Sequence, residues 1–401
     1  MGNNIPQGYK ATALGIIPQE WEVMRLGDIV SITSGESPSL YHLKAEGKYP
    51  YVKVEDLNNC EKYQESSREY SDDNNTTIKA GSIIFPKRGA SILNNKVRIA
   101  AKDIQMDSNM MAITPHTTIV DTEFLYIRIL HERLYRIADT SSIPQINNKH
   151  IIPYKIAVPP LAEQRKIAEV LGVWDEAIEK QARLIEKLAL RKRGLMQRLL
   201  SAKLRLPGFS EPWKIHKLQE LFTERNETNR TDLPLLSITG DRGVILQTES
   251  EKRDTSNDDK SKYKRIAKGD IGYNTMRMWQ GRSALSGLEG IVSPAYTIVV
   301  PNTDVDGYYM SVLFKQPRLI YDFWTHSQGL VGDTLNCKYR DFGQVHICCP
   351  PLAEQKAITE VLTAADREIE LAKEKLERLR RQKGSMMQQL HSGKKRVKIN
   401  I

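Results

Sequence analysis

The sequence has few cysteines and no apolar run long enough to cross a membrane. A transmembrane helix needs about 20 consecutive apolar residues, and no segment of the 401 residues approaches that length. The first ten residues lack the charged-then-apolar pattern of a secretory signal. The four cysteines form no Cys-x-x-Cys pair and no Cys/His cluster with zinc spacing. We therefore expect a cytoplasmic protein without a metal site, in which the adjacent Cys348 and Cys349 are buried, reduced strand residues.

The signatures of several enzyme classes are absent as well. There is no glycine-rich cofactor loop and no Asn-Pro-Pro-Tyr type motif, both expected of a methyltransferase that flips its target base. Residues 393–395, Gly-Lys-Lys, lack the spacing and the hydroxyl residue of an ATPase phosphate-binding loop. No HExxH, GxSxG or nucleophilic Cys/His arrangement occurs, and the acidic residues form no convincing nuclease cluster. The sequence predicts a non-catalytic chain with no cofactor of its own.

Charge is plentiful but unevenly distributed. The net charge of +10 suggests a nucleic-acid partner. Residues 179–205 contain nine Lys/Arg against two Glu, and residues 371–401 contain ten against two. The remainder of the chain is therefore net negative, so any DNA-binding face there must be a local patch. With 40% hydrophobic residues over 401 positions, the composition is that of a folded protein with two or more domains.

A tandem repeat dominates the sequence. Pro-Pro-Leu-Ala-Glu-Gln at 159–164 recurs at 350–355, a shift of 191, and the same register continues for some forty residues. A Trp-x-x-x-x-Leu signal at 21–26 recurs at 213–218, shifted by 192. Each half of the chain therefore consists of a Trp signal, a variable globular region, the Pro-Pro-Leu-Ala-Glu-Gln signal and the segment that follows it.

The segments that follow the paired prolines are predicted to be long helices. Apolar residues recur there at three- and four-residue steps, which indicates an apolar stripe along a helix. A spacing near 3.5 over several heptads favours a coiled coil, with Trp174 in its core. Proline is tolerated in the first turn of a helix but not inside it, so each pair marks a helix start. A helix of about forty residues is roughly 60 Å long and suits a spacer.

The globular regions are predicted to be mixed α/β (α+β) domains. In each, a turn leads into a short apolar strand, at 80–86 and at 268–273. The other expected elements are a helix at Thr122–Arg136 and strands at Lys96–Ala101, Met110–Thr114, Ala295–Val300 and Gln344–Cys348. The expected domain order is 1–158, the helical region 159–205, the second domain 206–349 and the helical region 350–401.

This pattern resembles the specificity subunits of type I restriction-modification systems, over nearly the whole chain. The resemblance rests on the two Pro-Pro-Leu-Ala-Glu-Gln helices, each preceded by a variable domain with a Gly-Asp/Ser-Ile strand and a Trp signal. It implies two target-recognition domains that each read one half of a split, asymmetric DNA target, and repeated helices that pair antiparallel. It also implies two methyltransferase (modification) subunits and restriction subunits as partners, to which S-adenosylmethionine, ATP and Mg²⁺ would belong.

Polar and basic side chains that follow a predicted strand are the candidate DNA contacts, because Asn pairs well with adenine and Arg with guanine. The candidates are Lys87, Arg88, Asn94, Asn95, Lys96 and Arg98 in the first domain, and Asn274, Arg277, Gln280 and Arg282 in the second. Weaker candidates before the final strands are Gln145, Asn147, Asn148, Lys149, Asn336 and Lys338. The alternatives are a solvated hairpin in the first domain and, in the second, a core position for Met276, Met278 and Trp279.

The repeated helix starts allow two interpretations. Local helix-start structure alone, or docking of a partner in addition, would account for Leu161, Glu163, Gln164, Leu352, Glu354 and Gln355. For the whole chain, two further hypotheses are a DNA-binding regulator or scaffold that dimerises through its coiled coil, and a catalytic DNA enzyme with an unrecognised site. Two unlike domains within one chain favour the specificity subunit, and the missing cofactor motifs count against the enzyme.

Overall fold

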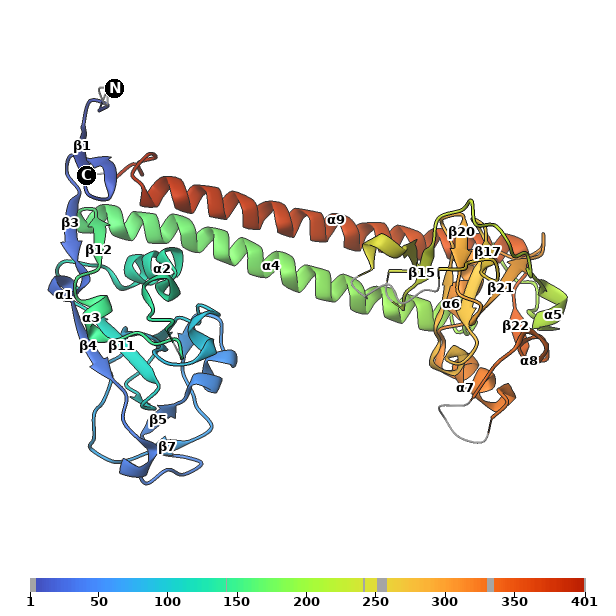
Figure 1. Cartoon of the computed structure of the whole chain (residues 1–401), viewed down its shortest axis with the longest axis horizontal. Helices are drawn as coiled ribbons and strands as arrows, with labels where there is room; N and C mark the ends of the chain where they lie inside the picture. Colours follow the sequence, from blue (N-terminus) through green and yellow to red (C-terminus); the bar gives the residue numbers. More distant parts are fainter. Residues whose placement is uncertain (1–4, 142, 241, 251–257, 330–334, 400–401) are drawn as a thin grey trace. The chain divides into compact units, whose positions relative to one another are not determined.

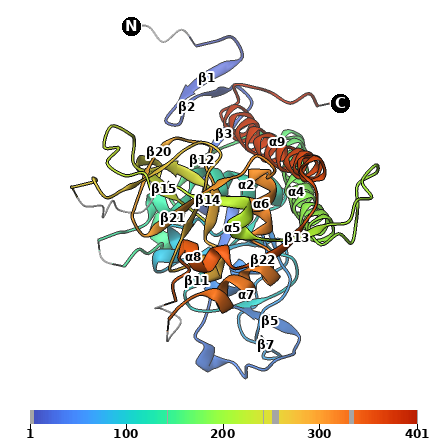
Figure 2. The same cartoon turned by 90° about the vertical axis from the view of Figure 1, so that its right-hand side faces the viewer.

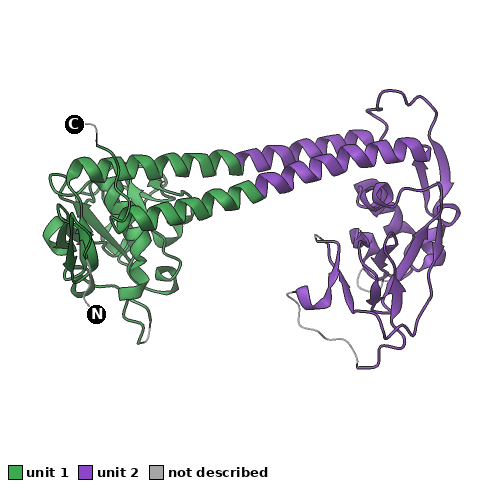
Figure 3. Ribbon diagram, turned by 90° about the horizontal axis from the view of Figure 1, so that it is seen from above, with its two compact units in different colours: residues 1–182, 374–401 green, residues 183–373 purple. Residues whose placement is uncertain are grey.

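The computed structural model describes residues 5–141, 143–240, 242–250, 258–329 and 335–399. The chain forms two compact units, coloured separately in Figure 3. Unit 1 comprises Met1–Ala182 and Glu374–Ile401, and unit 2 comprises Arg183–Lys373. The two long helices, α4 (Leu161–Leu199) and α9 (Leu352–His391), are therefore each shared between the units. The sequence-based division set these helices apart from the domains, whereas in the structure each domain packs with part of both.

The globular part of unit 1 is built around a five-stranded sheet with the order β4-β11-β8-β9-β6. Its elements are β1 (Tyr9–Thr12), β2 (Gly15–Pro18), β3 (Glu22–Arg25), α1 (Leu26–Ile29), β4 (Val30–Ser34), β5 (Tyr49–Val52), β6 (Tyr63–Gln64), β7 (Tyr70–Ser71), β8 (Ile83–Pro86), β9 (Arg98–Ala100), β10 (Gln105–Met106), β11 (Met110–Pro115), α2 (Thr122–Glu132), α3 (Asn148–Ile151) and β12 (Lys155–Val158). The β1–β2 hairpin lies beside the segment after α9 (Figure 2), where the Tyr9 hydroxyl donates to the Gly393 carbonyl at 2.9 Å.

Side-chain alternation along the central strands gives unit 1 two cores. Successive residues of a strand point to opposite faces of the sheet. Ile83 and Phe85 of β8 join the core formed with α2 and with Ile167 of α4, whereas Ile84 joins a second core with β5 and β10. The sheet is thus covered on both faces, and its strands are short apolar runs.

The globular part of unit 2 repeats this topology with a different sequence. Its elements are β13 (Lys214–Lys217), α5 (Leu218–Leu221), β14 (Phe222–Glu224), β15 (Leu236–Ile238), β16 (Val244–Leu246), β17 (Lys264–Ile266), β18 (Ile271–Asn274), β19 (Ser283–Leu285), β20 (Gly290–Val292), β21 (Tyr296–Pro301), α6 (Gly307–Leu313), α7 (Pro317–His326), α8 (Tyr339–Gly343) and β22 (His346–Cys349). The sheet order β14-β21-β18-β19 corresponds to β4-β11-β8-β9, and β13 pairs with β22 as β3 pairs with β12.

Most of the expected elements are present, with two corrections. The helix expected at 122–136 ends at Glu132, because Arg133 adopts a left-handed conformation with φ 57°, and a short 3-10 turn, η4 (Leu134–Ile137), follows. The four cysteines are free, but Cys348 is exposed and only Cys349 is buried. The expectation of two buried cysteines is wrong because neighbouring residues of β22 face opposite sides.

In each unit the parts of α4 and α9 run side by side in opposite directions (Figures 1 and 2). In unit 2, Arg191 pairs with Glu368 and Lys192 pairs with Asp366, so the two helices are antiparallel. In unit 1, Lys383 of α9 pairs with Asp175 of α4. The predicted apolar stripe is buried at Ile167, Leu171 and Leu188 of α4 and at Ile358, Leu362, Ala365, Ala372 and Leu376 of α9. Within the described residues, no helix is long and apolar enough to cross a membrane.

Candidate nucleic-acid interface

The two repeated signals meet inside unit 1, where they fasten the domain to its helix. The indole Nε1 of Trp21 donates to the Glu163 carboxylate at 3.0 Å, and Arg396 donates to the same carboxylate at 2.6 and 2.9 Å. The Glu163 carboxylate is only 1% exposed, and the partly exposed guanidinium of Arg396 balances its charge. An ion pair with a buried carboxylate therefore joins the start of α4 to the chain that follows α9.

Unit 2 contains the same arrangement at the repeated positions. Glu354, also 1% exposed, accepts from Trp213 Nε1 at 3.2 Å and from Arg205 at 2.6 and 2.8 Å. Arg205 and Arg396 are 191 residues apart, the shift of the repeat. Sequence reasoning missed both arginines, although the shift would have paired them. Glu163 and Glu354 thus have structural roles. Docking of a partner at the half-buried Leu161 and Leu352 stays a prediction.

The glutamines of the repeat tie each domain helix to the long helix. Gln164 accepts from the backbone N–H of Asp121 at 2.8 Å and donates to the Pro159 carbonyl at 2.7 Å. Gln355 accepts from the backbone N–H of Asp306 at 2.9 Å and donates to the Pro350 carbonyl at 2.8 Å. Asp121 and Asp306 are the N-caps of α2 and α6. In each unit, therefore, a single glutamine side chain fixes the start of a long helix against the start of a domain helix.

A cluster of cationic and imidazole side chains is buried where α9 meets α2 in unit 1. His391 is 2% exposed and stacks on His131 at 5.1 Å between ring centroids. Its backbone carbonyl accepts from Arg128, which also pairs with Glu132 at 2.6 Å. Burial lowers the pKa of His391 well below its usual value, and the charge of Arg128 lowers it further. The repeated position is Leu200, directly after the end of α4, so this histidine is peculiar to unit 1.

Unit 1 is predicted to lose stability in acid because of His391. A histidine whose pKa is lower in the folded than in the unfolded state takes up a proton first in the unfolded state. The free energy of unfolding is therefore unaffected above about pH 6.5. Below that pH it falls by up to about 1.4 kcal/mol per pH unit. Denaturant unfolding at pH 7.5 and 5.5 measures this loss. His391→Leu, which copies Leu200, should reduce it, whereas substitution of the exposed His346 should not. An unchanged pH profile in His391→Leu would contradict the assignment.

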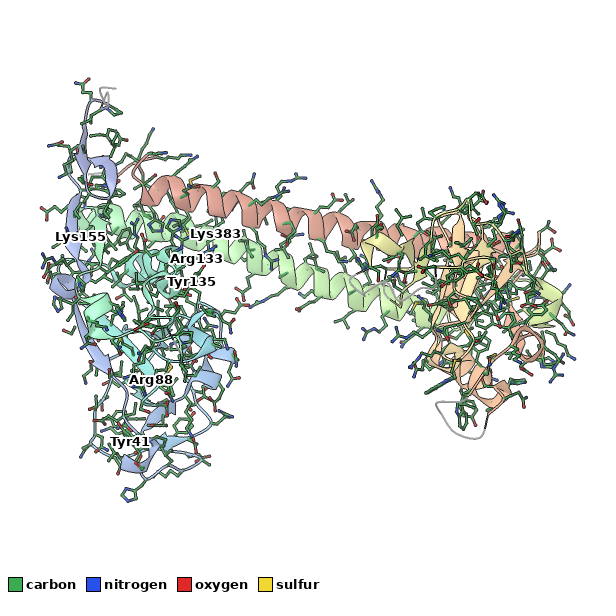
Figure 4. The ribbon with its side chains drawn as sticks, in the orientation of Figure 1. Tyr41, Arg88, Arg133, Tyr135, Lys155 and Lys383 are labelled. Atoms are coloured by element: carbon green, nitrogen blue, oxygen red, sulfur yellow. The ribbon has the colours of Figure 1, made fainter. Side chains whose placement is uncertain are left out.

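The candidate loop of the first domain connects two paired strands of the sheet. β8 and β9 are antiparallel neighbours, so residues 87–97 form the connection of a long hairpin. Backbone contacts hold this connection against the later segment 139–145, since Arg88 bridges to Gln145 and the Gly89 N–H donates to the Pro144 carbonyl at 2.9 Å. Arg88 and Asn94 are exposed (Figure 4 labels Arg88), and Lys87 is half-buried. Burial and the neighbouring Arg88 charge lower the pKa of Lys87.

Three candidates of the first domain are engaged in internal contacts. Arg98 donates through Nε, Nη1 and Nη2 to the carbonyls of Cys60, Val97 and Leu57, each at 2.8 Å. Asn95 has φ 49° and its side chain donates to the Leu130 carbonyl at 3.0 Å. Lys96 donates to the Asn58 side chain at 2.5 Å. These contacts give the three side chains a part in holding the loop in place, and DNA contact by the six candidates of this domain stays a prediction.

The candidate loop of the second domain occupies the corresponding place. It connects β18 to the paired strand β19 at residues 275–282 and contains the 3-10 turn η6 (Met278–Gln280). Arg277, Gln280 and Arg282 are exposed. Asn274 instead caps the turn, because its side chain accepts from the Met276 N–H at 3.0 Å. Of the three apolar residues, Met278 is fully buried, Trp279 is half-buried and Met276 is 47% exposed.

A hollow of about 610 Å³ opens beside this second loop. Its lining combines the loop residues Thr275 and Met276 with the weaker candidates Asn336 and Lys338. The Cys337 N–H donates to the Thr275 carbonyl at 2.8 Å, so the segment before α8 is fixed against the loop. In both domains, therefore, a strand-connecting loop and the segment before the last short helix form one surface.

A third segment completes this surface and was missed by sequence reasoning. In the first domain it is η4, whose Leu134 lies with Phe85, Asn95 and Ile146 around a small cavity. Exposed Arg133 donates to the Tyr135 hydroxyl at 3.2 Å and lowers the pKa of that phenol (Figure 4). In the second domain the third segment is α7, which packs against η6. No sequence signal joined these segments to the loops, because the contacts form only on folding.

The described residues offer no cluster of three or more His, Cys, Asp or Glu side chains placed to hold a metal ion. The surface built from the three segments is instead composed of arginine, lysine, amide and aromatic side chains. Such groups donate to phosphates and base edges and pack against bases. The arrangement therefore suits a nucleic-acid ligand.

Comparisons with known proteins agree with this geometry. Residues 18–189 match the family model described as the type I restriction modification DNA specificity domain. Two relatives come from Methanocaldococcus jannaschii. The type I restriction enzyme MjaVIII specificity subunit is 24% identical, with 95% of this chain and 94% of the relative covered. The putative type I restriction enzyme MjaX specificity subunit is 26% identical, with 98% and 97% covered.

Solved structures show the same fold at low sequence identity. A chain from a structural study of complex assembly and conformational transition in a type I R-M system has a TM-score of 0.62 at 17% identity, with 94% of this chain and 99% of that chain covered. The HsdS subunit of Thermoanaerobacter tengcongensis has a TM-score of 0.54 at 16% identity, with 94% and 98% covered.

Proposed function

We propose that this chain is a type I restriction-modification specificity subunit, as its similarity to that family indicates, and that its two globular domains read the two halves of a split DNA target. The observation that carries the proposal is the repeated surface. Two domains of equal topology present a loop from equivalent strand pairs, β8–β9 and β18–β19, each fixed to a later segment of its own domain.

The two half-sites should differ in sequence, because the exposed side chains of the two loops differ. The first loop presents Arg88 and Asn94, which suit guanine, adenine or phosphate, and the second presents Arg277, Gln280 and Arg282. An internal tandem repeat with paired helices suits duplex DNA, whose two strands are related by the same kind of two-fold symmetry. The target is then bipartite and asymmetric, and the helices set the spacing between its halves.

The chemistry is assigned to the partners of the chain. We propose that two modification subunits dock on the assembly of domains and helices, and that restriction subunits complete the enzyme. In this scheme S-adenosylmethionine, ATP and Mg²⁺ bind to those subunits, and this chain contributes recognition without catalytic residues. The half-buried Leu161 and Leu352, at the start of the repeated helices, remain candidate docking residues.

Methylation in cells tests the proposal directly. Cells that express the cognate modification subunit, with and without this chain, are compared by single-molecule sequencing of DNA methylation. We expect a split methylated motif that appears only with the chain. Replacing residues 206–349 by the equivalent domain of a relative should change one half of the motif and leave the other. With a modification subunit of verified activity, a motif that does not depend on the chain would favour a regulator or scaffold instead.

A further inference from the structure

Helix α7 of the second domain exposes two large aromatic side chains. Tyr321 is 59% exposed and Trp324 is 47% exposed. Their ring centroids are 5.5 Å apart with the planes inclined at 40°. Residues three positions apart lie on one face of a helix, and Leu319 and Phe323 fill the core from the opposite face. Leu319 and Phe323 therefore hold α7 in the core, and α7 does not need the exposed pair for packing.

The aromatic pair lies beside the candidate loop of the same domain. α7 packs against η6, and a Cβ on Gly281 would come within 3.0 Å of Cδ1 of Ile320. Trp324 follows Ile320 by one helical turn and therefore continues the same side of α7. Met276 of the loop is also exposed. Loop and helix together form an apolar surface with two exposed rings.

Cations frame this surface. Arg277 and Arg282 lie on the loop, and Arg318 precedes Tyr321 by three positions on α7. Lys338 and Arg340 line the hollow next to Met276, where Glu224 and its partner Lys264 are also found. The single acid in the sequence of α7 is the half-buried Asp322. A polyanion whose grooves expose apolar sugar and base edges complements this combination better than a protein surface does, because cations lie on the loop and on α7 beside the rings.

The described residues of the first domain show no equivalent pair. Its third segment, η4, contains one aromatic residue, the half-buried Tyr135, which is hydrogen-bonded to Arg133. Arg133 and Arg136 on either side are exposed. The corresponding surfaces are thus polar and basic in the first domain, and aromatic and basic in the second.

We propose that Tyr321 and Trp324 contact duplex DNA at the half-site of the second domain, where their rings pack against sugars and base edges in a groove, beside the phosphates bound by the neighbouring arginines. The inference rests on the proposed function and assigns an aromatic contact to one of the two domains. Aromatic side chains contribute to DNA binding without neutralising phosphate charge. Their contribution is therefore distinguishable from that of the arginines by its dependence on salt.

The test measures DNA affinity of the complete complex with its modification subunits, at two salt concentrations, on the motif found for the wild-type chain. Trp324→Ala should weaken binding roughly tenfold, because the apolar area that the indole buries on DNA is lost, without changing the salt dependence, and Trp324→Phe should recover much of the loss. Arg318→Ala should weaken binding and reduce the salt dependence. Tyr63→Ala is the matched control, because Tyr63 is 47% exposed but lies on β6 of the first domain and not at the half-site of the second.

Each outcome decides between the hypotheses. If Trp324→Ala binds DNA as the wild type does, the aromatic contact is refuted while the motif of the wild type still supports the specificity role. If Trp324→Ala instead fails to assemble with the modification subunits in the absence of DNA, the pair belongs to a protein interface. If the wild-type chain itself confers no motif, the proposed function fails first. Unfolding of Trp324→Ala should match the wild type, because the side chain is exposed.

Discussion

Arg205→Ala is expected to lower the free energy of unfolding of unit 2 by roughly 3–5 kcal/mol. The substitution removes both hydrogen bonds from Arg205 to Glu354 and leaves a carboxylate that is 1% exposed with only the indole of Trp213 as partner. Desolvation of an unpaired charge has a high free-energy cost, which explains the size of the effect. Denaturant unfolding at neutral pH measures it, and Arg396→Ala should act likewise on unit 1 through Glu163.

The double variant Arg205→Ala/Glu354→Gln separates charge burial from packing. A neutral amide in place of the carboxylate should restore part of the stability, because no charge remains buried. Arg193→Ala serves as the control, since Arg193 is an exposed residue of α4 in the same unit, and its effect should stay within about 0.5 kcal/mol. Equal losses for Arg205→Ala and Arg193→Ala would show that Arg205 does not stabilise the Glu354 carboxylate in solution.

Arg277→Ala is expected to weaken DNA binding by the assembled complex by about 1–3 kcal/mol, the usual range for a side chain that contacts a base edge through two hydrogen bonds. The fold should be unaffected, because Arg277 is exposed and its side chain has no partner among the described residues. Binding assays with base changes in each half-site should place the loss in one half alone. Arg88→Ala should act in the same way on the other half.

Arg378→Ala provides a control for nonspecific charge effects. Arg378 is an exposed residue of α9 outside both candidate loops, so its removal should leave base preference unchanged. If Arg277→Ala lowers affinity equally for all sequences, Arg277 contacts phosphate and not a base. If neither affinity nor preference changes, Arg277 is removed from the interface, and Arg282 and Gln280 become the principal candidates of that loop.

The strand-end pattern in the sequence predicts the position of the candidate loops but not which of their side chains are exposed. The pattern located both loops, because a glycine turn followed by a short apolar strand is a local signal. Gly81 and Gly269 indeed have φ of 82° and 95° before β8 and β18. The same pattern did not distinguish Arg88, which is exposed, from Arg98, which donates to three carbonyls of its own domain. That difference depends on which backbone groups need a donor after folding.

The sequence by itself determined the repeat, the two long helices and the mixed α/β domains, because each of these depends on periodicity or on residues close together in the chain. Tertiary structure decided the rest. Residues as distant as Trp21 and Arg396 bind one buried carboxylate, that of Glu163. Likewise, α7 joins the loop at 275–282 only through packing. The physical reason is that burial and desolvation determine which polar groups must pair internally, and burial is a property of the folded chain.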